Sequence, residues 1–327
     1  MKILVTGSSG HLGEALSRHL HESGHEVVGI DITDAPTTTE IGSIADRAFI
    51  ARCMQGVEAV CHTATLHKPH VATHGRQEFV ETNITGTLNL LEEAVSACVG
   101  AFIFTSTTSV FGSALVPTPG APAAWITENV VPVPKNIYGV TKAAAEDFCQ
   151  LFNRNQDLAC LILRTSRFFP EEDDNRAMRE TYADANLKAN EFLFRRVAIE
   201  DVVSAHIAAL ERAASIGFGR YIISATTPFS QADAVDLRAD AQEVVRRLVP
   251  DHVAEYARRD WRMFPTIDRV YDNAKARTEL GWRPAFDFAH VVERLKRDEP
   301  VIGDLAQRIG IKGYHAETFA DGPYPVD

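Results

Sequence analysis

The sequence predicts an α/β fold in which a doubly wound parallel sheet carries a smaller C-terminal portion. Short apolar runs alternate with amphipathic stretches of helical spacing through the first half of the chain, which is the order of repeated βαβ units. The expected strands are 3–6, 26–31, 59–64, 101–106 and 159–164. The expected helices between them are 12–23, 84–98 and 138–155.

The pattern of residues changes after Arg164, where the smaller portion is expected to begin. Residues 167–191 are polar, charged and weakly periodic, so we expect a loop-rich insertion there. An amphipathic helix at 199–213 and a core strand at 219–224 then return to the sheet. The expected larger domain comprises residues 1–165 and about 196–226, and the smaller portion comprises about 166–195 and 227–327.

Composition argues against several classes of partner. Asp and Glu outnumber Lys and Arg by 44 to 33, for a formal net charge of −11, so we expect no nucleic-acid or membrane partner. The first residues are strand-like rather than a signal peptide, and no apolar run is long enough to span a bilayer. The five cysteines lack CxxC spacing, which is typical of buried thiols in a reducing compartment, so we expect a cytoplasmic protein.

Residues 6–13, TGSSGHLG, join an expected strand to an expected helix. In this context Gly7 permits a tight turn, Gly10 lets a pyrophosphate approach the backbone, and Gly13 permits close packing of helix on strand. The helix N-terminus then offers unpaired N–H groups to phosphates. The candidate cofactor-binding residues of this turn are Gly7, Ser9, Gly10, His11, Leu12 and Gly13.

Asp31 strengthens the prediction of a dinucleotide site. It ends the second expected strand, 24 residues after Gly7, close to the spacing of a ribose-binding acid. Its carboxylate would accept hydrogen bonds from both ribose hydroxyls and would repel a 2′-phosphate. Because Ile32 and Thr33 follow it, no adjacent basic residue favours NADP. We therefore expect a Rossmann-type domain that binds NAD.

Tyr138 and Lys142 lie one helical turn apart, a spacing that alone does not distinguish packing from catalysis. Together with TGxxGxxG and the hydroxyl-rich strand end FTSTTS, however, this YxxxK pattern resembles the short-chain dehydrogenase/reductase superfamily. Further stretches resemble its extended branch, the NAD-dependent epimerase/dehydratase family. They are TNITGTLNLLEEA at 82–94, VFG at 110–112, YGVTKAAAE at 138–146, RRVAIEDVVSAH at 195–206 and ARTELGWRP at 276–284.

The resemblance implies a catalytic trio of Thr107, Tyr138 and Lys142. Tyr138 would exchange a proton with a substrate hydroxyl while hydride moves to or from the nicotinamide. Bringing a phenol pKa from about 10 toward 7 requires about 4 kcal/mol, which Lys142 and the oxidised nicotinamide would supply. Lys142 would also hold the nicotinamide ribose. Ser106 and Thr108 adjoin Thr107, so the register of the hydroxyl is open by one residue, and Thr108 is a substrate-binding candidate.

The same resemblance assigns supporting residues. Ser43 stands where the family often has an adenine-contacting Asp, and Ala64 would pass its backbone close to the cofactor. Asn83 is expected to organise strand and loop. His62, His67, His70 and His74 cluster in sequence, but their spacing suits a loop and no acidic or cysteine partner joins them, so we expect no metal. His67 is a candidate for substrate contact.

Residues 164–174, RTSRFFPEEDD, depart from the family pattern RxxNxYGP. Arg167 replaces an asparagine that lies near the sugar nucleotide in nucleotide-sugar enzymes, and nucleotide-binding residues later in the chain are not evident. The same stretch resembles uronate dehydrogenases, in which an arginine pairs with the sugar carboxylate. Arg176 occupies that spacing, with Arg179 as the next candidate. The alternative is that Arg176 is a solvated loop residue paired with Asp173 or Asp174.

The function expected is NAD-dependent hydride transfer at a secondary alcohol of a sugar or nucleotide sugar, of epimerase or dehydratase type, with Tyr138 as acid/base. One alternative is an NAD-dependent dehydrogenase of a free, uronate-like sugar acid. A further alternative is a dinucleotide-sensing regulator, because fold alone does not establish catalysis. A homodimer packed through helices 84–98 and 138–155 is implied by the resemblance.

Overall fold

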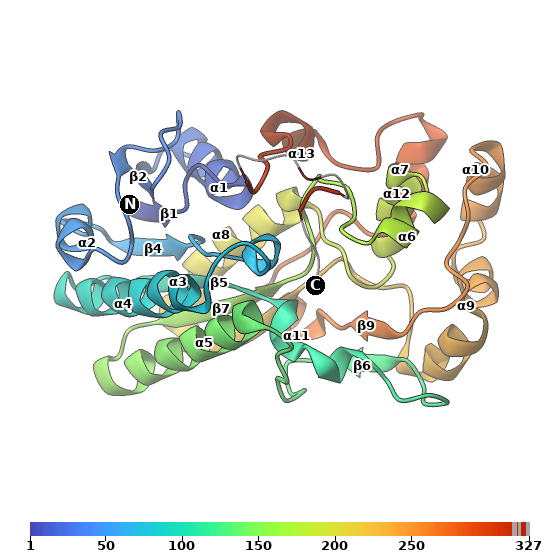
Figure 1. The fold of residues 1–327 in the computed structure, drawn as a ribbon, viewed down its shortest axis with the longest axis horizontal. Coiled ribbons are helices and arrows are strands. Elements are labelled where there is room, and N and C mark those ends of the chain that lie inside the picture. The colour runs from blue at the N-terminus through green and yellow to red at the C-terminus, as the bar shows by residue number, and fades with distance from the viewer. Residues whose placement is uncertain (316–318, 320–321, 325–327) are drawn as a thin grey trace.

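Seven parallel strands form one sheet in the computed structural model of the chain, which describes residues 1–315, 319 and 322–324 (Figure 1). The strand order is β3-β2-β1-β4-β5-β7-β8, the doubly wound arrangement that the sequence predicts. The strands are β1 (Lys2–Thr6), β2 (Glu26–Asp31), β3 (Glu40–Ile41), β4 (Ala59–His62), β5 (Ala101–Thr107), β7 (Cys160–Thr165) and β8 (Phe218–Ile223).

Each central strand is buried on both faces. On β1, Ile3 and Val5 belong to one hydrophobic core and Leu4 belongs to the other. The same alternation separates Phe102 from Ile103 on β5. Two-sided burial explains why these strands are continuous apolar runs in the sequence.

Two layers of helices cover the sheet (Figure 1). One layer contains α1 (His11–Glu22), α8 (Ile199–Ile216) and α13 (Asp304–Ile309). The other contains α2 (Arg47–Cys53), α4 (Gly86–Ser96) and α5 (Ile137–Gln156), with α3 (Arg76–Phe79) nearby. The predicted helices at 12–23, 138–155 and 199–213 are therefore confirmed to within a few residues.

Two predicted boundaries differ from the structure, both next to the cavity described below. β4 ends at His62 rather than at residue 64, because the backbone N–H groups of Thr63 and Ala64 donate to Thr6 Oγ1 (3.1 and 3.0 Å). The predicted helix 84–98 begins as a π-helical turn, Val80–Thr85, and becomes α4 at Gly86.

A second core lies beside the sheet and contains most of the C-terminal portion. It is built around α7 (Asp184–Glu191), α9 (Ala234–Leu248), α10 (His252–Arg258), α12 (Phe288–Lys296), and the parallel pair β6 (Ala124–Ile126) and β9 (Arg269–Tyr271). The short α11 (Ala274–Glu279) packs on β8 instead. Because β6 pairs with β9, part of the sequence before residue 165 lies in this portion.

The prediction of a loop-rich insertion at 167–191 is wrong in part. The segment contains α6 (Arg176–Thr181) and α7, and α7 is buried from Asn186 to Glu191. Its polar side chains have partners: the Asn186 and Asn190 side-chain amides both donate to the carbonyl of Arg262 (3.0 and 2.8 Å). The polar residues of this segment suggested an exposed loop, whereas in the structure their side chains form hydrogen bonds in the interior.

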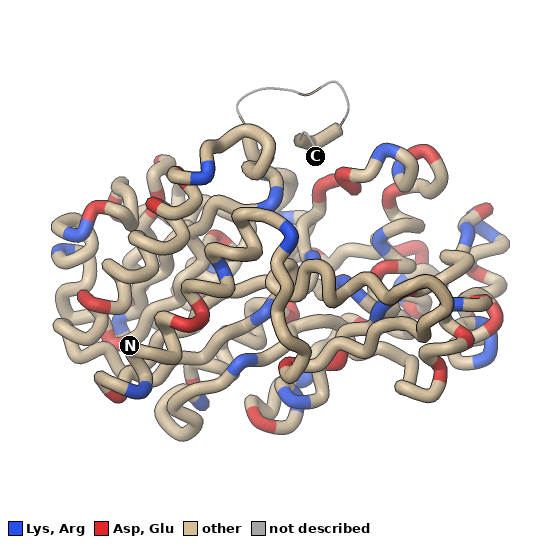
Figure 2. Tube along the Cα trace, turned by 60° about the horizontal axis from the view of Figure 1, so that its bottom comes forward, with Lys and Arg blue, Asp and Glu red and all other residues tan. Residues whose placement is uncertain are grey.

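Charge and cysteine placement are partly as expected. Acidic and basic residues are interspersed along the described chain (Figure 2). Cys53, Cys61, Cys149 and Cys160 are buried, but Cys98 is exposed at the end of α4 with φ of 57°, which corrects the expectation that all five thiols are buried. Among the described residues, no helix is long and apolar enough to cross a membrane.

Candidate active site

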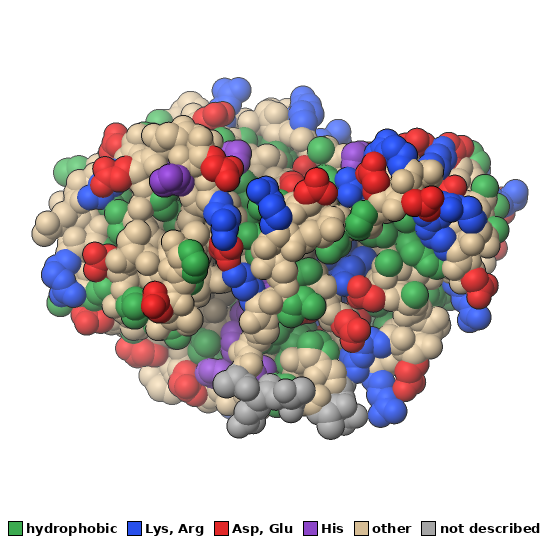
Figure 3. Space-filling model, turned by 90° about the horizontal axis from the view of Figure 1, so that it is seen from above, with side chains coloured by type: hydrophobic (Ala, Val, Ile, Leu, Met, Phe, Trp, Pro, Cys, Tyr) green, Lys and Arg blue, Asp and Glu red, His purple; other side chains and the backbone are tan. Residues whose placement is uncertain are grey.

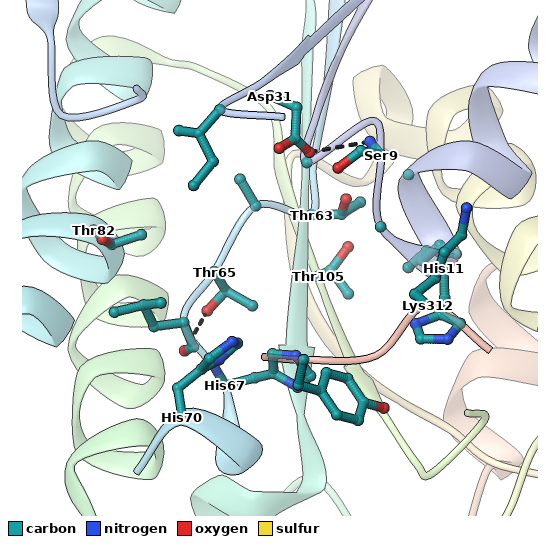
Figure 4. Close-up of a pocket in the computed structure, with 18 of the residues that line it drawn as sticks. Ser9, His11, Asp31, Thr63, Thr65, His67, His70, Thr82, Thr105 and Lys312 are labelled. Carbon is teal, nitrogen blue, oxygen red and sulfur yellow. Dashed lines mark hydrogen bonds between the residues drawn. The ribbon is translucent and has the colours of Figure 1, made fainter. Parts of the chain in front are cut away.

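The cavity lies where the strand order reverses, at the carboxyl ends of β1 and β4. It has a volume of about 530 Å³ and is lined by the glycine turn and the ends of β2 and β4 (Figure 4). Tyr138 also lines it. The backbones after β1 and β4 touch at this point, because a Cβ on Gly7 would lie 2.8 Å from Ala64 Cα.

The glycine turn is as compact as the motif requires. Gly7 has φ of +70°, a left-handed conformation that favours glycine. A Cβ on Gly13 would lie 1.9 Å from the carbonyl oxygen of Gly7, so only glycine fits there. The turn directs the start of α1 at His11 toward the cavity, and Ser9, Gly10, His11 and Leu12 line it. These amides can bind a pyrophosphate.

Asp31 lies at the cavity wall beside this turn. Its Oδ2 accepts a hydrogen bond from the backbone N–H of Ser9 (3.0 Å), and its Oδ1 accepts from Thr33 (3.0 Å). Each carboxylate oxygen keeps a lone pair for a ribose hydroxyl. Ser43 and Ala64 also line the cavity. The glycine turn, the helix N-terminus and this acid therefore fit NAD.

Tyr138 lies at the other end of the cavity, and Lys142 is buried one turn further along α5. Burial raises the pKa of Tyr138 to about 12, and a hydrogen bond with the Thr107 hydroxyl opposes that rise. Burial also lowers the pKa of Lys142 to about 7, against the carboxylate of Glu146. The Lys142 ammonium lies 4.0 Å from the centre of the Phe104 ring.

The structure distinguishes the three hydroxyls at the end of β5. Thr107 is the one hydrogen bonded to Tyr138. Ser106 lines the cavity, and its hydroxyl donates to Glu146 Oε1 (2.5 Å). Thr108 is buried and begins the turn after the strand, and neither Thr107 nor Thr108 belongs to the cavity lining. The hydrogen bond with Tyr138 supports Thr107, whereas the cavity lining contains Ser106, so the position of the reacting hydroxyl stays a prediction.

Asn83 organises this end of the cavity, as expected. Its Oδ1 accepts from the backbone of Leu66 and the hydroxyl of Thr65 (both 2.9 Å). Its Nδ2 donates to the carbonyl of Leu66 (2.8 Å) and to Thr141 Oγ1 (3.0 Å). Asn83 thereby ties the loop after β4 to the helix that carries Tyr138.

The histidines separate into two environments. His62 is buried between Thr6 and Thr87, with ring nitrogens 2.7 and 3.0 Å from their hydroxyls. His67, His70 and His74 line the cavity, and Figure 3 shows a group of histidine side chains toward the lower edge of the face that it draws. Burial, with His70 nearby, holds the pKa of His67 well below its ordinary value. Among the described residues, no group of three or more His, Cys, Asp or Glu could hold a metal.

The structure does not bring Arg167 or Arg176 into the cavity lining. Arg167 donates to Asp173 Oδ2 (2.5 Å) and lies 3.7 Å from Glu191 Oε1. The side chain of Arg176 is 69% exposed on α6, and its Nε donates to Glu180 Oε1 (2.8 Å). The ion pair of Arg176 therefore involves Glu180, whereas the sequence suggested Asp173 or Asp174.

Several lining residues escaped the sequence analysis. Phe168, Phe169 and the distant Lys312, Gly313 and Tyr314 all line the cavity. Phe168 and Phe169 could have been found, because they follow the strand next to the predicted site. The residues from 312 onward carry no motif and no periodicity that would have assigned them.

Comparison with known proteins agrees with this geometry. The model of the NAD-dependent epimerase/dehydratase family matches residues 3–223. The chain therefore belongs to this family, and its cofactor is NAD.

Individual relatives are distant. A UDP-glucose 4-epimerase of Erwinia amylovora is 29% identical over 182 residues, covering 50% of this chain and 52% of the relative. A dTDP-glucose 4,6-dehydratase of Streptomyces antibioticus is 27% identical over 329 residues, covering 90% and 91%. The chain spans about half the length of the curated relatives that it matches first: 52, 55 and 50%.

Solved structures share the fold. The UDP-glucuronic acid 4-epimerase of Bacillus cereus in complex with NAD superimposes with a TM-score of 0.62 at 23% identity, covering 97% of this chain and 99% of that one. At this identity the likeness concerns the architecture alone.

Proposed function

We propose that this protein is an NAD-dependent enzyme acting on a secondary alcohol of a sugar or nucleotide sugar, in the manner of an epimerase or dehydratase. The observation that carries the proposal is the cavity itself. One end has the glycine turn and Asp31, and the other has Tyr138 hydrogen bonded to Thr107, with Lys142 one turn away.

The glycine turn and Asp31 would hold NAD, which would supply a reversible hydride acceptor for the alcohol carbon. Tyr138 would take the hydroxyl proton as the hydride leaves, and Thr107 would hold the substrate oxygen against the phenol. Lys142 would stabilise the phenolate, because an ammonium one turn away on the same face favours the charged form. Since burial raises the pKa of Tyr138, this stabilisation is needed near neutral pH.

Two observations bear on the substrate. Relatives named UDP-glucose 4-epimerase and dTDP-glucose 4,6-dehydratase support a sugar nucleotide. Arg176, the candidate ligand for a sugar-acid carboxylate, is exposed and bonded to Glu180 outside the cavity lining, which disfavours the dehydrogenase alternative. Substrate contact by His67, which lines the cavity 6.5 Å from Tyr138 between ring centres, is part of the proposal.

The proposal is tested by the fate of the cofactor. Purified protein is heat-denatured and the released nucleotide identified, and the native protein is then offered NAD with UDP- and dTDP-sugars, free sugars and uronic acids. Product formation from a nucleotide sugar without net NADH supports the epimerase/dehydratase mode. Net NADH with a uronate would establish the dehydrogenase instead, and the absence of NAD binding would overturn both.

A homodimer packed through α4 and α5 is also proposed. Val140 and Leu151 on α5 are 49 and 37% exposed, which leaves apolar surface on that helix. Light scattering after gel filtration tests this: a mass near 72 kDa, twice the 36.0 kDa of one chain, supports the dimer.

A further inference from the structure

A segment near the C-terminus returns to the cofactor cavity. Residues 312–315, called here the C-terminal segment, follow α13 and Gly310. Lys312, Gly313 and Tyr314 line the same cavity as the glycine turn. In Figure 4 the segment enters beside His11, where Lys312 is labelled, and runs toward His67. These residues are far from the glycine turn in the sequence, and only the folding of the chain brings them to the cavity.

Three separate elements hold the C-terminal segment. The Lys312 ammonium pairs with Glu14 on α1. The backbone N–H of Lys312 donates to Glu171 Oε1 (3.2 Å) in the loop after β7. The His315 ring is hydrogen bonded to the carbonyl of Pro69 (3.0 Å), in the loop after β4. The segment therefore bridges the loops and the helix that surround the cavity.

Glu171 is the central attachment. It is 4% exposed, and its Oε1 also lies 2.7 Å from Nε2 of His11, the first residue of α1. One buried carboxylate thus links the helix that would receive the pyrophosphate to the C-terminal segment.

The ring of Tyr314 lies between the attachment at Glu171 and the end of the cavity that contains Tyr138. Its ring centre lies 4.8 Å from that of His67 and 6.0 Å from those of Phe169 and His11. The His67 ring in turn lies 6.5 Å from Tyr138. Tyr314 is therefore separated from the proposed acid/base by a single intervening ring.

The C-terminal segment also has the backbone features of a movable element. Gly310 and Gly313 have φ of +67° and +69°, and glycine changes between such conformations at low cost. Lys312 and Gly313 line the cavity and are also exposed to solvent, so the segment lies between the cavity and the surrounding water.

We propose that the C-terminal segment closes the cofactor site. It covers the bound dinucleotide, with Tyr314 as the wall beside the reacting end, and cofactor exchange requires it to move away about Gly310 and Gly313. The inference rests on the proposed function only in that the cavity binds NAD. A cover of this kind slows cofactor release and keeps water from the reacting atoms.

The test measures NADH release from the full-length holoprotein and from variants. Protein loaded with NADH is mixed with excess NAD in a stopped-flow instrument, and the decay of bound-NADH fluorescence gives the dissociation rate. Deletion of residues 311–327 should raise that rate about tenfold or more, which corresponds to about 1.4 kcal/mol. Tyr314→Ala and Lys312→Ala should raise it by smaller factors. Ile311→Ala is the matched control, because its side chain is 69% exposed.

The possible results distinguish closure by the C-terminal segment from the proposed NAD-dependent function. Faster release in the deletion and in Tyr314→Ala, with Ile311→Ala unchanged, supports the closing role. Equal release rates in the full-length protein and the point variants overturn it and leave the NAD site intact, even where the deletion does not fold. Failure of the full-length protein to bind NADH overturns the proposed function as well.

Discussion

At the residue scale, the chemistry depends on what surrounds Tyr138. Burial raises the pKa of its phenol, while the Thr107 hydroxyl opposes that rise. Burial also lowers the pKa of Lys142 to about 7, so its charge near neutral pH responds to its neighbours. A phenolate at Tyr138 would favour the charged form of Lys142, and the charged Lys142 would favour the phenolate. The two groups are therefore expected to titrate together.

Tyr138→Phe removes the proposed acid/base while keeping the ring. We expect turnover to fall by about 10²- to 10⁴-fold, the usual contribution of general acid–base catalysis, with NADH affinity nearly unchanged. Steady-state kinetics with the substrate found in the panel, together with NADH titration, check this.

Tyr182→Phe is the matched control for that change, since Tyr182 packs against Phe264 in the second core. Full turnover in Tyr138→Phe would contradict the catalytic role and favour the dinucleotide-sensing alternative.

At the element scale, α1 is positioned by the close approach of Gly13 to Gly7. Gly13→Ala would place a Cβ 1.9 Å from the Gly7 carbonyl oxygen, so the start of α1 must shift. We expect a loss of about 1–3 kcal/mol in unfolding free energy, typical of overpacking, and weaker NADH binding. Urea unfolding and NADH titration measure both effects.

Gly100→Ala serves as the comparison, because the nearest atom to its Cβ is an ordinary 3.6 Å away. Equal behaviour of the two variants would be inconsistent with the close packing of the turn.

α7 is stabilised by the buried carboxylate of Glu191. Burial alone would raise the pKa of Glu191, but Arg195, Arg196 and Arg167 outweigh it and hold that pKa at about 2. A lowered folded-state pKa gives stability that is present above the ordinary value of 4.5 and is lost as pH falls toward 2. The difference between a pKa of 4.5 and one of about 2 corresponds to about 3 kcal/mol of unfolding free energy.

We therefore expect the wild-type unfolding free energy to decrease between pH 5 and pH 3, and Glu191→Gln to show a smaller decrease from a lower starting value. Urea unfolding at several pH values checks this, with the exposed Glu22→Gln as control. Parallel pH curves for wild type and Glu191→Gln would show that Glu191 does not carry this dependence.

At the scale of the whole molecule, Glu146 connects the catalytic helix to the sheet. It is 2% exposed on α5 and accepts hydrogen bonds from Ser106 on β5 (2.5 Å), Arg164 on β7 (2.7 Å) and Arg220 on β8 (3.2 Å). One carboxylate thus fixes α5, and with it Tyr138, relative to three adjacent strands.

Glu146→Met leaves Arg164 buried without its counter-charge, and we expect a loss of about 3–5 kcal/mol in unfolding free energy. The double variant Glu146→Met/Arg164→Met should be more stable than the single variant, because both charges are gone. Chemical denaturation of the complete double-mutant cycle measures the coupling.

The exposed pair of Glu243 with Arg246 provides the control. Glu243→Gln should change stability by less than about 1 kcal/mol. Additive effects at Glu146 and Arg164 would contradict the buried link.

Much of the fold and of the cofactor site was predictable because its signals are local. The glycine turn, Asp31 at a strand end and the one-turn spacing of Tyr138 and Lys142 are each set by a few adjacent residues. The parallel sheet then brings strand ends to one edge, so residues such as Asp31 and Ser9 meet without further information (Figure 1).

Only the tertiary structure decided the remainder. It buried most of the polar helix α7, placed Arg176 outside the cavity lining and brought the C-terminal segment to the cofactor site. A buried charge is stable only beside its partner, and Lys312 meets Glu14 across almost the full length of the chain. Such long-range pairing has no periodicity in the sequence, whereas strands, helices and turns do.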